Sequence, residues 1–151
     1  MAQENRISLK ITSEDKTKIE NAIDVIEKTL KPYLIALKPD ERHGLPKAAD
    51  KTVAFLNKTK EFMESNPDLT PSFIDKDEYI IDLNATEELN GYYAVLNQIV
   101  SMLNDTMMLS ASEAYVAALS YYGNAKNAAK LKIPGAKEVY DDLSKRFKGK
   151  S

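Results

Sequence analysis

The chain has 151 residues and a mass of 16.9 kDa, so we expect a single domain over residues 1–151. Hydrophobic residues make up 43% and charged residues 29% of the chain, which is typical of a globular protein and excludes wholesale disorder. The chain has no cysteine and one histidine, which excludes disulfides, thiolate metal sites, cysteine nucleophiles and sites built from several histidines.

Charge is distributed unevenly along the chain, although the net charge is only −2. Residues 1–63 carry a net charge of +2, residues 64–113 carry −9 and residues 114–151 carry +5. The low total leaves no overall basic field, so we expect binding neither to nucleic acid nor to a membrane. The acidic middle is expected to lie beside the basic end within one fold, or to face a basic partner.

The first elements expected are an extended arm and a long helix. Apolar and polar residues alternate in residues 1–12, which favours an extended arm. Thr12 and Asp15 have the spacing of a helix N-cap, and apolar residues three and four positions apart predict a helix over residues 13–37. Pro32 interrupts this helix, and we expect a kink there because the apolar stripe continues beyond it.

A connection follows, with one helical turn expected after Pro39. A second helix is expected over residues 47–65, ended by Pro67. Asp75 and Glu78 have the spacing of a further N-cap and predict the start of a third helix.

From residue 75 to residue 131 the apolar pattern has a helical period. An unbroken helix of this length would measure roughly 85 Å, so a bundle needs a turn within it. Asn90-Gly91 is the first choice for this turn, and Ser110, which has Glu113 three residues later, is the second. A last short helix is expected after Pro134-Gly135. The prediction is an all-α fold, an antiparallel helical bundle of about four helices plus a short C-terminal helix.

Three stretches resemble a family of small bacterial all-helical proteins of about this length to which no function is assigned. They are residues 45–55 (LPKAADKTVAF), residues 112–119 (SEAYVAAL) with Tyr122, and residues 134–143 (PGAKEVYDDL) with Lys145-Arg146-Phe147. The resemblance implies a helical bundle. It implies no activity, cofactor or catalytic residue.

The residues needed for common catalytic sites are missing. A carboxylate-bridged dimetal bundle needs two histidines on helices, and the single His43 lies in a predicted loop. The chain has no Gly-x-Ser-x-Gly elbow and no glycine-rich phosphate-binding loop. An enzyme with an unusual site would need several acidic side chains to converge, those of Asp75, Asp82, Glu87 and Glu113. We therefore expect no catalytic residue, no metal and no cofactor.

Tyrosines and alanines are concentrated between residues 92 and 129. We predict a candidate interaction or ligand surface from five of these tyrosines: Tyr92, Tyr93, Tyr115, Tyr121 and Tyr122. Three interpretations stay open: close packing between helices of the chain, a surface for a protein partner or a second copy, and a ligand pocket lined by tyrosine hydroxyls. Met102, Met107 and Met108 are expected to fill the core, with an adaptable binding surface as the alternative.

The sequence thus predicts a non-enzymatic helical bundle that acts through protein–protein association or self-association, for example as a homodimer. The alternative is a carrier or sensor of a small apolar or aromatic ligand bound between helices. The first residues are polar and lack the apolar stretch of a signal peptide, and no apolar run approaches the ~18 residues of a spanning helix. We expect a cytoplasmic protein.

Overall fold

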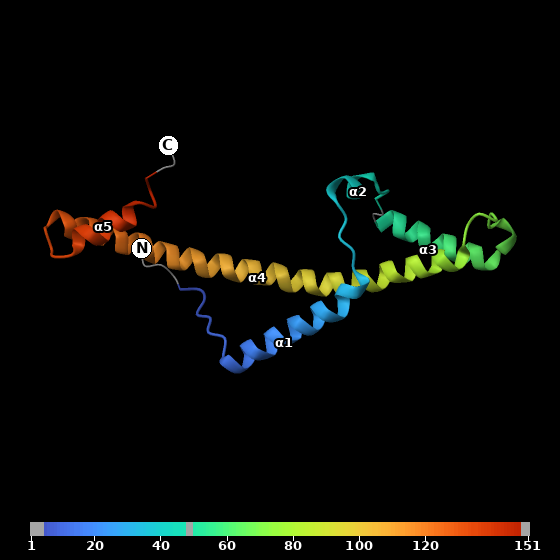
Figure 1. The fold of residues 1–151 in the computed structure, drawn as a ribbon, viewed down its shortest axis with the longest axis horizontal. Helices are drawn as coiled ribbons and strands as arrows, with labels where there is room; N and C mark the ends of the chain where they lie inside the picture. Colours follow the sequence, from blue (N-terminus) through green and yellow to red (C-terminus); the bar gives the residue numbers. More distant parts are fainter. Residues whose placement is uncertain (1–4, 48–49, 149–151) are drawn as a thin grey trace. The chain divides into compact units, whose positions relative to one another are not determined.

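The computed structural model describes residues 5–47 and 50–148, and the regular structure in these residues is entirely helical (Figure 1). The all-α prediction is confirmed. The chain divides into two units. We call Ile11–Asn97 the α1–α3 unit, and Met1–Lys10 together with Gln98–Ser151 the α5 unit.

Helix α1 spans Ser13–Leu30 and begins at the predicted N-cap, where the Thr12 side chain accepts a hydrogen bond of 3.1 Å from the backbone N–H of Asp15. The predicted continuation to residue 37 is wrong. A short 3₁₀ turn, η1 (Lys31–Tyr33), follows α1, and the backbone is extended at Leu34. The reason is Pro32, which has no N–H to donate to the carbonyl one turn earlier and therefore ends the helix instead of kinking it.

The predicted turn after Pro39 is confirmed as α2 (Pro39–Gly44). Helix α3 spans Asp50–Ser65, and residues 48–49, near its predicted start, lie outside the described residues. Pro67 follows the end of α3, as predicted, and opens a second 3₁₀ turn, η2 (Pro67–Leu69).

Helix α4 spans Lys76–Lys130 without interruption. Asp75 caps its start, since one carboxylate oxygen accepts hydrogen bonds from the backbone N–H groups of Asp77 (2.9 Å) and Glu78 (3.1 Å). The predicted turn, at Asn90-Gly91 or near Ser110, is wrong.

Local chemistry explains why neither position breaks the helix. A glycine in a helix interior costs about 1 kcal/mol relative to alanine, but it keeps both backbone hydrogen bonds, so Gly91 weakens α4 without ending it. Ser110 would need Glu113 as its partner in a cap. The Glu113 carboxylate instead accepts a hydrogen bond of 2.8 Å from the backbone N–H of Arg6 in the N-terminal arm.

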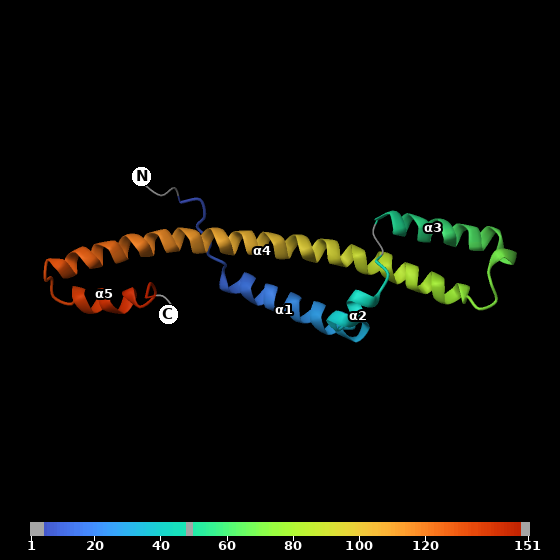
Figure 2. The same ribbon diagram turned by 90° about the horizontal axis from the view of Figure 1, so that it is seen from above.

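In the α1–α3 unit, α3 lies beside the first turns of α4 (Figures 1 and 2). The Tyr79 hydroxyl donates a hydrogen bond of 2.8 Å to the backbone carbonyl of Leu56. Leu83 of α4 is 4% exposed and is the most deeply buried apolar residue described. These contacts fix α3 against one side of α4.

In the α5 unit, α5 (Ala136–Ser144) folds back along the end of α4 (Figure 2). The reversal uses two residues with positive φ, Lys132 at 58° and Gly135 at 80°. The left-handed conformation at Gly135 suits glycine because it has no Cβ to clash. Ala125 of α4 and Ser144 of α5 are both buried.

Apolar burial is sparse throughout the described residues. Leu83 and Ala125 are the hydrophobic residues that are buried, whereas most large apolar side chains of α1 and α4 are exposed. Every helix described is too short or too polar to cross a lipid bilayer. The antiparallel arrangement of four helices stays a prediction.

Candidate functional site

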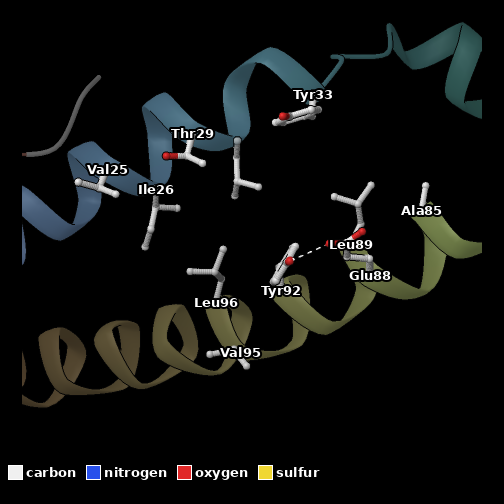
Figure 3. A pocket seen from close by; sticks show the side chains of 11 residues that line it. Val25, Ile26, Thr29, Tyr33, Ala85, Glu88, Leu89, Tyr92, Val95 and Leu96 are labelled. Carbon is white, nitrogen blue, oxygen red and sulfur yellow. Dashed lines mark hydrogen bonds between the residues drawn. The ribbon is translucent and has the colours of Figure 1, made fainter.

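A concave surface lies within the α1–α3 unit, between the last turns of α1 and the part of α4 that faces them (Figure 3). It is an open groove with a volume of about 880 Å³, and we call it the α1/α4 groove. Residues from α1, η1 and α4 line it: Val25, Ile26, Thr29, Leu30, Tyr33, Ala85, Glu88, Leu89, Tyr92, Val95 and Leu96.

The groove is apolar because both helices turn a hydrophobic stripe toward it. Ile26 of α1 and Leu96 of α4 point toward each other across the gap (Figure 3). Their stripes do not close on each other, and Ile26 remains 41% exposed and Leu89 40% exposed. The groove is therefore a pair of facing apolar helix surfaces with space left between them.

Tyr92 and Glu88 form a polar pair in the otherwise apolar groove. The Tyr92 hydroxyl donates a hydrogen bond of 2.9 Å to the Glu88 carboxylate, one helical turn earlier (Figure 3). This hydrogen bond, reinforced by the negative charge of Glu88, raises the pKa of Tyr92 above its usual value. The Tyr92 proton is thus directed toward the Glu88 carboxylate.

Tyr122 has a different position, in the α5 unit. Its ring stacks on Tyr140 with centroids 5.5 Å apart and lies 4.9 Å from the ring of Phe147. Burial raises the pKa of Tyr122, and the neighbouring Tyr140 phenol adds to the effect. We call Tyr122, Tyr140 and Phe147 the aromatic cluster. It attaches α5 to α4, so Tyr122 has a packing role here.

The other three predicted tyrosines, Tyr93, Tyr115 and Tyr121, are exposed on α4. The five tyrosines do not form one site within either unit, since Tyr92 belongs to the α1/α4 groove and Tyr122 to the aromatic cluster. The predicted core role of Met102, Met107 and Met108 is wrong within the single chain, because all three side chains are more than half exposed. This exposure favours the alternative of an adaptable binding surface.

Sequence reasoning missed the α1 side of the groove, because it used the apolar stripe of α1 only to predict a helix. It also missed a signal in α4. Between Glu88 and Lys126 there are 37 residues, and only Asp105 and Glu113 among them are charged. At the overall charged fraction of 29%, a stretch of this length would carry about 11 charged residues. A low density of charge on an exposed helix is typical of a face that packs against another surface.

In the described part of the chain, no three acidic or histidine side chains gather in a way that could hold a metal ion. Comparison with protein-family models, curated proteins and solved structures gave no match for this chain. The geometry of the groove and the exposure of α4 are therefore the observations from which function has to be argued.

Proposed function

We propose that this chain is a non-enzymatic helical protein that works by self-association, with the exposed apolar faces of α1 and α4 covered by another copy. The proposal includes a cytoplasmic location.

The observation that carries the proposal is the exposure of large apolar side chains within each unit. In the α1–α3 unit, Ile19, Ile23, Val25 and Ile26 of α1 are 41–61% exposed. In the α5 unit, Val100, Met102, Leu103 and Met107 of α4 are 57–68% exposed. Contiguous exposed apolar residues mark sites of protein–protein interaction, so they support association with another copy.

Sedimentation velocity over a range of concentrations tests this function. We expect a species of at least twice 16.9 kDa that dissociates on dilution, and a melting temperature that rises with protein concentration. A species of 16.9 kDa at all concentrations, with a melting temperature independent of concentration, would contradict self-association.

A carrier of a small apolar or aromatic ligand is the second candidate, and the α1/α4 groove favours it. Its volume of about 880 Å³ is within the range of roughly 300–1,000 Å³ found for ligand pockets, and Tyr92 and Thr29 add polar groups. Native mass spectrometry of protein from its own host would then show an adduct of constant mass. We expect Ile26→Asp to lose the adduct and Ile19→Asp, on the same helix outside the groove, to keep it. If the wild-type protein from its own host shows only the mass of the chain, with no adduct, the carrier function is contradicted.

A further inference from the structure

The α1/α4 groove carries a single formal charge. Eleven described residues line the groove, and Glu88 is the one among them that is charged. The other polar side chains of the groove are hydroxyl groups, those of Thr29, Tyr33 and Tyr92. A molecule that fills the groove therefore meets one charged group, and that group is a carboxylate.

The charge of Glu88 is not neutralised by a cation among the described residues. Its carboxylate accepts the hydrogen bond from the Tyr92 hydroxyl, but none of the ion pairs described in the chain includes it. Lys28 and Lys31 each pair with a carboxylate one helical turn earlier on α1 itself. A carboxylate has lone pairs for several donors, so Glu88 can accept a further hydrogen bond from a ligand.

We propose that the α1/α4 groove binds an amphiphilic amine, with the ammonium group of the ligand against Glu88 and its apolar body between Ile26 and Leu96. This inference rests on the proposed carrier function and names the class of ligand. Charge complementarity selects the ammonium group. An anionic head group would meet the Glu88 carboxylate with like charge, and a neutral head group would leave it without a counter-charge.

The spacing along α4 sets the shape of the ligand. Glu88 and Leu96 are eight residues apart on one helix, which is about 12 Å along its axis at a rise of 1.5 Å per residue. Ile26 points toward Leu96 from the other wall of the groove (Figure 3). The charged head and the apolar end of the ligand thus bind two helical turns apart, which suits an extended chain. The groove volume of about 880 Å³ leaves room for such a chain.

Two tyrosine rings favour a cation at the Glu88 end of the groove. The Tyr92 hydroxyl is hydrogen-bonded to Glu88, so this side chain lies beside the carboxylate. Tyr33 of η1 lies at the same end of the groove (Figure 3). The face of an aromatic ring attracts a cation, so the rings and the carboxylate recognise the same head group.

Three probes with the same chain and different head groups test the ligand class: octylammonium, octanol and octanoate. Isothermal titration calorimetry of the whole protein at neutral pH, at one fixed protein concentration, gives their dissociation constants. We expect octylammonium to bind about 10-fold more tightly than octanol, and octanoate about 10-fold more weakly than octanol. If octanol or octanoate binds as tightly as octylammonium, the ligand class is wrong although the carrier function stands. If no probe binds, the ligand class and the carrier function both fail.

A pair of isosteric substitutions tests the role of Glu88. Glu88→Gln removes the charge and keeps the shape of the side chain, so we expect the preference for octylammonium over octanol to be lost. Unchanged binding of octanol to this variant would show that the groove is intact. Glu87→Gln is the matched control, because Glu87 is exposed on α4 and does not line the groove, and we expect it to keep the preference. A preference that persists in Glu88→Gln, or that Glu87→Gln removes equally, would overturn the assignment.

Discussion

Replacing Gly91 with alanine tests whether α4 is one helix through the position where the sequence suggests a turn. A Cβ built at Gly91 meets no heavy atom within 4 Å, so the substitution brings no clash. Glycine in a helix interior is less favourable than alanine by about 0.8–1.0 kcal/mol. We therefore expect Gly91→Ala to raise the free energy of unfolding by about 1 kcal/mol. Gly123→Ala, equally free of clashes and also within α4, should give a gain of similar size.

Replacing Gly135 with alanine is the control, and here the free energy of unfolding is expected to fall. Gly135 also has free space around it, but its φ is +80°, in the left-handed region. An alanine there costs roughly 1–2 kcal/mol, so Gly135→Ala should destabilise the protein although it adds the same methyl group. The two directions separate a backbone effect from a general effect of added apolar volume.

Urea denaturation followed by far-UV circular dichroism measures these changes, at one fixed protein concentration because self-association couples stability to concentration. With a denaturant slope of roughly 1–3 kcal/mol per molar, a change of about 1 kcal/mol moves the midpoint by roughly 0.3–1 M. The reasoning is refuted if Gly91→Ala lowers the midpoint while Gly123→Ala raises it. That result would mean that the chain turns at Asn90-Gly91 after all.

Three further outcomes follow from the described contacts. Tyr122→Ala removes two aromatic contacts worth about 0.5–1.5 kcal/mol each, so hydrogen exchange of the α5 amides should accelerate, and unchanged exchange would rule out the anchoring role. Thr12→Ala removes the cap of α1 and should cost about 1 kcal/mol, whereas Thr17→Ala, whose hydroxyl donates within the helix, should cost less; equal losses in urea would contradict the cap. Tyr92 and Tyr122 have raised pKa values, so their stabilising neutral forms persist below the unfolded-state value near 10 and are lost as pH rises through the folded-state pKa. A pH titration of phenolate absorbance should show two tyrosines that ionise at higher pH than the others. One of them should be lost in Tyr92→Phe and the other in Tyr122→Phe. If no tyrosine ionises at higher pH than the others, the raised pKa values are refuted.

Helix ends that depend on neighbouring residues were predictable. The Thr12 cap, the Asp75 cap and the turn after Pro39 each depend on side chains within three or four positions of the backbone they fix. The effect of Pro32 was misjudged because the apolar stripe beyond it suggested that the helix continued. The lost hydrogen bond and the steric clash of the ring outweighed that stripe.

The candidate site was predictable only in part. Tyr92 was among the expected interaction residues, and the structure places it in the α1/α4 groove. Its partners across the groove, Val25 and Ile26, belong to a helix far away in the sequence, and no local pattern connects the two segments. Tyr122 was grouped with Tyr92 because both are tyrosines in one stretch, whereas its ring packs on Tyr140 and Phe147 from the last part of the chain.

The sequence by itself determined that this protein is all-helical, where most of its helices begin and end, and which chemistries its residues exclude. These properties depend on periodicity, on caps and on residue types, all of which act over a few positions. The tertiary structure alone decided that α4 continues through Gly91 and Ser110, and that the apolar stripes of α1 and α4 face each other without closing. An apolar stripe predicts that one face of a helix is buried, but it does not identify the surface that covers this face. That surface belongs to a segment distant in the chain or to another molecule.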